Sequence, residues 1–337
     1  MFTLCGASST LMFDDCDVGI YYSNFMDNLM ENKEELSDWL ESTHRNVVPY
    51  TSSSRLDAWD ALIELDKEGS EGLVHLIYRD IQVDAFSYGG TETWNREHLW
   101  PKSRGVGKRG PDFSDLHMLR PSDWNVNAAR SNLFFGSCGI EHPLIECKSP
   151  AHKEAAIDTT KDSSTFLPPV SHRGDIARVI FYMATRYHTY LELTDCPSND
   201  NNQQMAYLSQ LLQWHMDDPV DEKEEQRNNK VCSHWQGNRN PFVDFPQLVT
   251  SYFGTPKPLL GDGLGYDCSS NDASPLMPGD VMFVSIHSDN PDSIVLVALN
   301  NIPPGTELYL SDNAWTGTGF HTTEGVMKVS TMEGFDN

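Results

Sequence analysis

The segments WNREHLWP (residues 94–101), SDLH (114–117) and NVNAARSN (125–132) decide how this chain of 337 residues is interpreted. The first segment places the carboxylate of Glu97 beside the imidazole of His98, which offers a hard-metal ligand and a general base at one point. Successive side chains of a regular strand point to opposite faces of a sheet. Glu97 and His98 can therefore serve one site only where a strand ends or bends, and the proline that closes the first segment favours such an ending.

Asn127 and Arg130 extend this pair to a candidate metal site. We expect Asn127 in a short helix, with Arg130 three residues later on the same helical face. Glu97 and the Asn127 amide then supply oxygen ligands, His98 supplies a base and Arg130 supplies a cation. Oxygen ligands with few protein contacts suit Mg²⁺, which keeps several of its waters. A zinc site would need more His or Cys residues, and an adjacent Glu and His lack the spacing of a helical zinc protease motif.

The charge around these residues differs in sign from the charge of the whole chain. The chain carries 24 Lys and Arg against 49 Asp and Glu, a net charge of −25, which disfavours a DNA-coating or membrane-surface protein. Residues 94–136 instead hold seven basic and four acidic side chains, a net charge of +3. A solvated loop explains such a window equally well on charge alone. Because it coincides with Glu97, His98 and Asn127, we interpret it as a phosphate-binding region.

Hydrophobic patterning predicts an α+β chain with two domains, for which 337 residues are sufficient. Helical periodicity and capping signals favour helices, and a dense apolar run favours a strand at 73–83. The helices are expected at 20–48, 58–66, 175–193, 205–215 and 219–235.

The composition changes near Gly254, where a segment rich in Pro, Gly, Ser and Asp begins. We therefore expect a first domain at 1–254, a linker at 255–279 and a second domain at 280–337. Three β-patterned runs at 281–287, 293–299 and 307–311 predict a β-sandwich that is cut short, because three strands leave edges unpaired. The segment 256–337 has two lysines and eleven acidic residues, so it carries much of the negative charge.

The seven cysteines do not form a Cys-x-x-Cys motif, which argues against a thiolate zinc site. Cys138 and Cys147 flank a short loop and are the candidate disulfide, while Cys5 and Cys16 are a second candidate pair. The first 15 residues lack the features of a signal peptide, and the apolar runs are too short to span a membrane. Six histidines have no recognisable partner and receive no function: His142, His152, His172, His188, His215 and His234.

Several motifs, in order, resemble those of the endonuclease I family, which are non-specific nucleases with a ββα-metal (His-Me finger) site. They are WNREHLWP, SDLHMLRPSDWNVNAARSNLFFG, GDIARVIFYMATRY, LLQWHMDDPVDEKEEQRN and QGNRNPF. The resemblance runs from about Asn46 to Phe253, and its motifs are highly specific. It implies that the first domain is a mainly helical nuclease domain around a ββα-metal motif. The later segment resembles, more weakly, β-sandwich modules of secreted hydrolases, with a role in adhesion or targeting.

The resemblance also implies roles for individual residues. His98 matches the general base of the family, and Glu97 and Asn127 match its two magnesium ligands. The phosphate-gripping arginine of the family falls in a variable loop, where both Arg104 and Arg109 qualify. The catalytic candidates are therefore His98, Arg104 and Arg130. The candidates for organising the site or contacting phosphate are Asp115, His117, Arg109 and Asn132.

The activity implied is sequence-independent hydrolysis of phosphodiester bonds in DNA, with RNA as a second candidate substrate and 5′-phosphate ends as products. One Mg²⁺ is the expected cofactor, with Mn²⁺ or Ca²⁺ as substitutes. We expect a monomer without a membrane span, in an extracellular or periplasmic location. The alternative is a catalytically silent protein on the same scaffold that binds nucleic acid or acts in surface adhesion. The overall acidity favours that alternative, whereas the intact Glu97, His98 and Asn127 argue against it.

Overall fold

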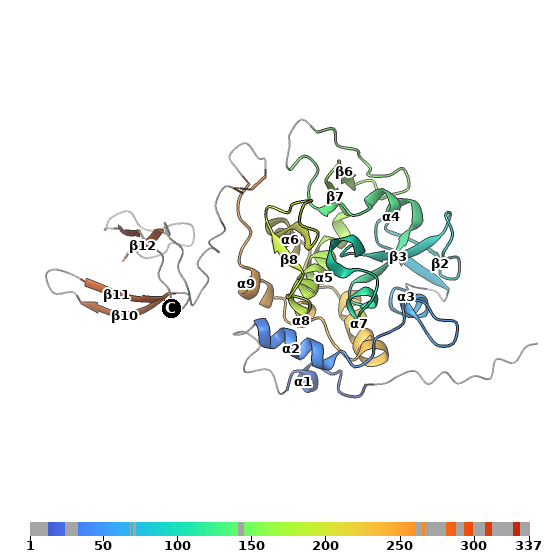
Figure 1. Ribbon diagram of the computed structural model, residues 1–337, viewed down its shortest axis with the longest axis horizontal. Helices are drawn as coiled ribbons and strands as arrows, with labels where there is room; N and C mark the ends of the chain where they lie inside the picture. Colours follow the sequence, from blue (N-terminus) through green and yellow to red (C-terminus); the bar gives the residue numbers. More distant parts are fainter. Residues whose placement is uncertain are drawn as a thin grey trace, which may run out of the picture. The chain divides into compact units, whose positions relative to one another are not determined.

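The computed structural model divides the chain into two compact units, residues 1–267 and 268–337 (Figure 1). The domain boundaries expected at 254 and 279 stay predictions. The residues that the structure describes are 13–23, 33–67, 69, 72–140, 145–259, 265, 266, 268 and four strands after residue 280. Two features expected from the sequence, the middle of the helix at 20–48 and the partner role of Cys5, depend on residues outside these ranges.

The described part of the first unit combines helices with small sheets, so its fold class is α+β. Its α-helices are α1 (Val18–Tyr21), α2 (Lys33–Thr43), α3 (Ala58–Leu65), α4 (Trp124–Arg130), α5 (Arg173–Arg186), α6 (Leu208–Asp217), α7 (Glu222–Lys230), α8 (Pro241–Asp244) and α9 (Leu248–Phe253). Its strands are β1 (Leu73–Leu76), β2 (Ile81–Asp84), β3 (Trp94–His98), β4 (Leu119–Asp123), β5 (Phe134–Phe135), β6 (Thr160–Lys161), β7 (Thr165–Leu167), β8 (Glu192–Thr194) and β9 (Gln204–Tyr207). These strands form sheets of two or three strands each.

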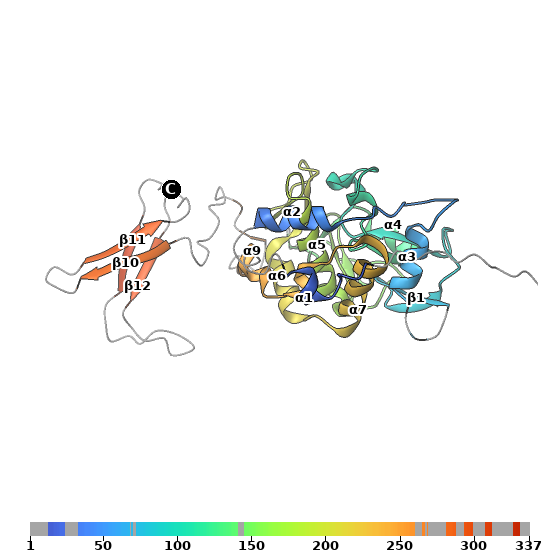
Figure 2. The ribbon, with the colours of Figure 1, turned by 90° about the horizontal axis from the view of Figure 1, so that it is seen from below.

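Helix α5 is the centre of the core, and it lies in the interior of the unit in both views (Figures 1 and 2). All but two of its 14 residues are buried, and it packs against α2, α6 and α8. Two charged side chains in this interior, Arg178 and Glu224 from α7, form an ion pair of 2.6 Å between Nη2 and Oε2. Such a buried charge requires a partner, because an isolated ion in the core would be strongly destabilising.

Strands β3 and β4 and helix α4 form a compact hairpin-and-helix unit. The strands are antiparallel, with Glu97 opposite Arg120 and His98 opposite Leu119. The chain passes directly from β4 into α4, and Asp123 caps this helix by accepting hydrogen bonds from the amides of residues 125 and 126. The side chains of Glu97, His98 and Asn127 are thereby carried on neighbouring elements.

The strand expected at 73–83 is wrong as a single element, because the chain reverses within it. Residues 77–80 form a turn between β1 and β2, which pair antiparallel from Leu73–Asp84 to Leu76–Ile81. Asp80 has a positive φ of 55°, a left-handed conformation that an Asp tolerates better than most residues. Periodicity did not reveal the turn, since Ile77 and Tyr78 within it are buried like strand residues.

The helices expected at 175–193 and 205–215 differ from α5 and α6 at one end each. Helix α5 ends at Arg186, and residues 192–194 form β8 instead. Helix α6 begins only at Leu208, because residues 204–207 form β9, which pairs parallel with β8. Local propensity did not identify these short strands, since each one depends on hydrogen bonds to the other.

Disulfides tie distant parts of the first unit together. Cys138 is bonded to Cys147, and Cys16 is bonded to Cys232 across 216 residues. The pairing of Cys5 with Cys16 is therefore wrong, because proximity in sequence was its only basis. Cys196 and Cys268 are also disulfide-bonded.

The second unit contains β10 (Val281–His287), β11 (Ser293–Ala298), β12 (Glu307–Ser311) and β13 (Val326–Ser330). Strand β10 pairs antiparallel with β11, and β12 pairs antiparallel with β13. The three strands expected from the sequence are present, whereas β13 was not predicted. A β-sandwich at 280–337 stays a prediction. Among the described helices of the chain, none has the length and apolar character needed to cross a bilayer.

The disulfides Cys16–Cys232 and Cys138–Cys147 should differ in their contribution to stability. We expect the double variant Cys16→Ala/Cys232→Ala to lose more free energy of unfolding than Cys138→Ala/Cys147→Ala, because the first bond closes a far longer loop. The chain-entropy relation gives a loss of about 5 kcal/mol for the long loop and about 3 kcal/mol for the short one. Urea unfolding without reductant measures both values, and equal losses would contradict the entropic explanation.

Candidate active site

The hairpin-and-helix unit borders a cavity of about 720 Å³. Strand β3 and helix α4 supply most of its chemistry, and the loop after β3 supplies two lysines. The contributing side chains are Asn95, Arg96, Glu97, His98, Lys102, Lys108, Asn127 and Arg130. Strand β3 ends at His98, and both Glu97 and His98 line the cavity, as the strand-ending argument requires.

The His98 ring is held in one tautomer by a main-chain carbonyl. Its Nε2 lies 2.9 Å from the Phe113 carbonyl oxygen. A carbonyl can only accept, so Nε2 carries the hydrogen and Nδ1 of the neutral ring keeps its lone pair. The ring also stacks on the Phe113 ring, with centroids 5.2 Å apart. His98 is thus fixed in orientation, with Nδ1 as its basic atom.

The electrostatic surroundings keep this imidazole neutral. Burial, with smaller contributions from Lys102, Arg96 and Arg130, lowers the pKa of His98 to about 3, although the Phe113 carbonyl opposes the shift. A burial effect of this direction is expected, because desolvation disfavours the charged form of the ring. At neutral pH the ring is therefore uncharged, and its Nδ1 retains a lone pair.

Glu97 is oriented by two donors that use the same oxygen. The Tyr78 hydroxyl donates to Oε1 over 2.8 Å, and Nη1 of Arg130 lies 3.2 Å from that atom. Burial raises the pKa of the Glu97 carboxyl, and the Arg130 guanidinium opposes this. These two contacts, together with a hydrogen bond from the His98 main chain, hold the carboxylate in one orientation beside the cavity.

Asn127 presents a second oxygen in the same way. Its Nδ2 group donates to Oδ1 of Asn95 over 2.8 Å, which leaves the Asn127 carbonyl oxygen as an acceptor. One carboxylate oxygen and one amide oxygen lining a cavity with room for several waters fit a hard cation such as Mg²⁺. The set contains no thiolate and a single imidazole, whose Nε2 is already bonded to the Phe113 carbonyl, so it suits zinc poorly.

Arg130 joins helix α4 to the end of β3. Its Nη2 donates to the Leu99 carbonyl over 2.8 Å, and its Nη1 donates to the His98 carbonyl over 3.2 Å. The side chain is 1% exposed, and it also contacts Glu97. Since its main partners are protein atoms, this geometry favours a positioning role for Arg130.

The two loop arginines lie outside the cavity lining. Nε of Arg104 donates to the Asn132 carbonyl over 2.7 Å, and Nη2 donates to Asn199 over 2.8 Å. The guanidinium packs over the Phe134 ring, and burial lowers its pKa to about 10. Arg109 is exposed and is absent from the lining. Asn132, by contrast, lines the cavity and reaches the Ser103 hydroxyl.

Asp115 and His117 lie behind the site and do not line the cavity. Asp115 is fully buried and accepts from the hydroxyls of Tyr182 and Tyr187 at 2.8 and 2.9 Å and from the Gln236 amide at 3.0 Å. Nε2 of His117 lies 3.1 Å from the Asn238 carbonyl, and burial lowers its pKa to about 3. Of the two roles expected for this pair, the geometry favours organisation of the site.

Sequence reasoning missed the cations and aromatic rings that line the cavity. Arg96 lies between the rings of Tyr50 and Trp59, at 3.5 and 4.0 Å from the two ring centroids. Lys102 and Lys108 line the cavity but were counted only as part of the local positive charge. The motif at 94–101 contained a signal for Arg96, whereas the contribution of Tyr50 has no local signal.

The chain is similar to known proteins over most of its first unit. The family model for endonuclease I matches residues 28–247. An extracellular ribonuclease of Bacillus amyloliquefaciens is 36% identical over 212 residues, which cover 60% of this chain and 70% of that protein. An extracellular ribonuclease of Bacillus subtilis (strain 168) is 36% identical over 220 residues, which cover 62% of this chain and 72% of that protein.

The lining lysines should govern the binding of a polyanion. In the double variant Lys102→Met/Lys108→Met we expect affinity for single-stranded nucleic acid at 0.1 M salt to fall by about 10-fold or more, because two phosphate contacts are lost. The slope of log K against log salt should fall by about one per lysine. Fluorescence anisotropy in EDTA measures both quantities.

Arg109→Met and Arg104→Met are the comparison variants for this experiment. Arg109 is exposed outside the lining, so its loss should leave the salt slope nearly unchanged. Arg104 is buried, so its loss should act mainly on stability. If Arg109→Met lowers the affinity and the salt slope more than the double lysine variant does, the phosphate contact belongs to Arg109 and not to the lysines.

The neutral buried histidines predict a dependence of stability on acid. The pKa values of His98 and His117 lie near 3 in the folded protein, whereas the ordinary value of 6.5 applies in the unfolded chain. Between these values the unfolded chain binds more protons, so the free energy of unfolding falls as the pH falls from 6.5 toward 3. Each ring contributes at most about 1.4 kcal/mol per pH unit.

Urea unfolding at several pH values between 6.5 and 4.5 tests this contribution. His117→Gln cannot titrate, so its free energy of unfolding should depend less steeply on pH than that of the parent protein. An unchanged slope would mean that His117 takes up its proton in the folded state.

Proposed function

The chain belongs to the endonuclease I family and is a nuclease, and we propose that it hydrolyses phosphodiester bonds of both RNA and DNA without sequence specificity. The observation that carries the proposal is the arrangement of one cavity: Glu97, His98 and Asn127 line it, and the carbonyl of Phe113 leaves Nδ1 of His98 as its basic atom. We further propose that β3, β4 and α4 constitute the ββα-metal motif.

The residues of this chain divide the reaction between them. His98 accepts a proton at Nδ1 from the water that attacks phosphorus, and burial keeps the ring uncharged before that step. Glu97 and Asn127 would hold a Mg²⁺, which supplies compensation for the charge on the phosphate and on the departing 3′-oxygen. Arg130 and Tyr78 keep Glu97 in place. A 5′-phosphate and a 3′-hydroxyl are the expected ends.

Substrate choice follows from what the cavity offers. Lys102 and Lys108 are suited to backbone phosphates, which carry no sequence information. A water nucleophile makes no use of the ribose 2′-hydroxyl, so the same chemistry serves RNA and DNA. Both Bacillus relatives are called ribonucleases, which supports RNA as a substrate.

We also propose an extracellular or periplasmic location and a monomeric state. The relatives are called extracellular, and disulfides persist in oxidising compartments. A catalytically silent scaffold is not retained as an alternative, because a protein that only binds has no need of an oriented neutral base.

The test compares His98→Ala with the parent protein on plasmid DNA and on a single-stranded RNA, with Mg²⁺ and with EDTA. Loss of a general base should lower kcat by about 10²- to 10⁴-fold. EDTA should abolish cleavage of both substrates by the parent protein. His152→Ala is the matched control, since its ring pairs with Glu154 away from the cavity.

The ends of the products provide a second criterion. Water attack leaves 5′-phosphates that a phosphatase removes from labelled fragments, whereas attack by a 2′-hydroxyl leaves cyclic phosphates and cannot cut DNA. A folded His98→Ala protein of unchanged activity would exclude His98 as the base. Cleavage of RNA alone, with cyclic ends, would overturn the water mechanism.

A further inference from the structure

A second cavity, of about 790 Å³, shares no lining residue with the active-site cavity. Strand β1, the turn after it and the start of α5 contribute to its wall, and β4 contributes Arg120 and Pro121. Because β4 pairs with β3, the hairpin borders both cavities, which use different side chains.

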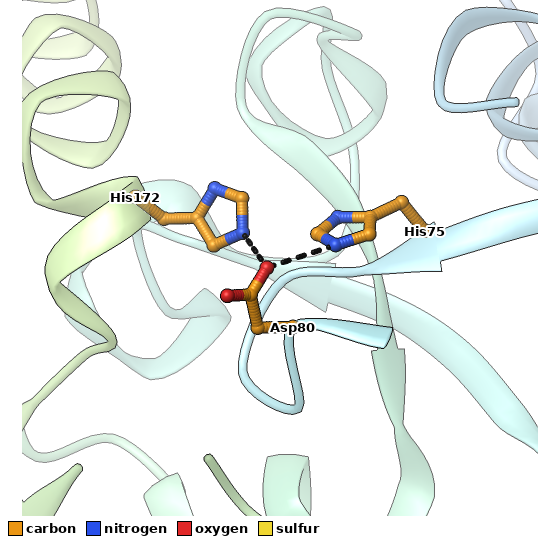
Figure 3. A group of neighbouring side chains, drawn as sticks. All are labelled: His75, Asp80 and His172. Atoms are coloured by element: carbon orange, nitrogen blue, oxygen red, sulfur yellow. Dashed lines mark hydrogen bonds and ion pairs between the residues drawn. The ribbon is translucent and has the colours of Figure 1, made fainter. Parts of the chain in front are cut away.

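Two imidazoles and a carboxylate converge at this second cavity (Figure 3). His75 lies on β1, Asp80 lies in the β1–β2 turn, and His172 immediately precedes α5. Oδ1 of Asp80 lies 3.0 Å from Nε2 of His75 and 3.2 Å from Nε2 of His172. All three ligand atoms lie within 4.8 Å of one another.

These separations are close to those between ligands of one small cation. Zinc binds imidazole nitrogen and carboxylate oxygen at about 2.0–2.1 Å, so ligand atoms at tetrahedral positions lie about 3.3 Å apart. Two nitrogens and one oxygen form a typical three-residue zinc set, with a water in the fourth position. The cavity beside the cluster has room for that water.

In two of the three residues, Asp80 and His172, the atom that would not face the cation is engaged by a neighbour. The Ser171 hydroxyl donates to Oδ2 of Asp80 over 3.1 Å. Oδ2 of Asp175 lies 3.6 Å from Nδ1 of His172, and Asp175 is held in turn by Arg178 at 3.2 Å. A carboxylate behind a ligating histidine is the usual outer contact of a zinc site, because it fixes the ring and increases its basicity.

We propose that His75, Asp80 and His172 form a second metal site that binds one Zn²⁺, separate from the nuclease centre. The ion joins β1, the β1–β2 turn and the first turn of α5. The turn also carries Tyr78, whose hydroxyl holds Glu97, so the zinc stabilises the wall of the active site without entering the reaction.

The same residues are in contact without a metal, because Asp80 pairs with both His75 and His172, and Asp175 pairs with His172. The competing explanation for the cluster is a set of ion pairs around His172 that has no affinity for zinc, and zinc binding by the intact chain distinguishes the two explanations.

The test uses the full chain, stripped with EDTA and equilibrated with buffered Zn²⁺. The parent protein and Glu97→Gln should each retain about one zinc per chain by elemental analysis and show a higher Tm with zinc. Asp80→Asn and His75→Gln should retain almost none and show no zinc-dependent rise in Tm. Ser171→Ala should bind zinc about 10- to 100-fold more weakly, as expected for an outer contact.

His234→Gln is the matched control, because Nδ1 of His234 lies 2.8 Å from Oε1 of Glu64, and among the described residues this pair belongs to no group of three metal-ligating side chains. It should bind zinc like the parent protein. His75→Gln leaves the contacts of Asp80 and Asp175 with His172 intact, so it stays informative if Asp80→Asn fails to fold. Retention of zinc by His75→Gln, loss of zinc in Glu97→Gln, or no zinc in the parent protein would overturn the proposal.

Discussion

The candidate active site depends on the hydrogen bonds that the buried carboxylate of Asp115 accepts. This carboxylate accepts hydrogen bonds from Tyr182, Tyr187 and Gln236, which belong to the helical core far along the chain. These bonds hold the long connection between β3 and β4 against α5. Phe113, two residues earlier, thereby presents its carbonyl to His98. The hydrogen bonds between the core and the buried Asp115 thus fix the tautomer of His98, the proposed base.

Arg130 likewise connects several parts of the candidate site through one side chain. A single guanidinium bonds to the carbonyls of His98 and Leu99 and also approaches Glu97. It therefore joins the end of a strand to a helix and orients a carboxylate. Its burial makes the arrangement rigid, since a buried charged group is stable only with its partners in place. Lys102 and Lys108 line the cavity and place positive charge there, although the chain as a whole is strongly acidic.

The fold could be predicted only where local pattern and tertiary structure agree. Helix α3, with its Asp57 cap, and the strands β10 and β12 match the expected segments closely, because their signals are local. The turn within 73–83 was missed because its buried Tyr78 continues the apolar run. Strands β8 and β9 were missed because each exists only through its pairing with the other.

The sequence by itself determined the family, and it identified Glu97, His98 and Asn127 as candidate site residues, because they lie within one short stretch whose order and spacing are distinctive. Only the tertiary structure decided which cations line the cavity. Arg104 donates to the Asn132 carbonyl and to Asn199 and is not part of the lining, whereas Lys102 is. The tertiary structure alone joined Cys16 to Cys232 and His75 to His172. The physical reason is that spacing along the chain constrains only near neighbours, while contacts between distant residues follow from how the whole core packs.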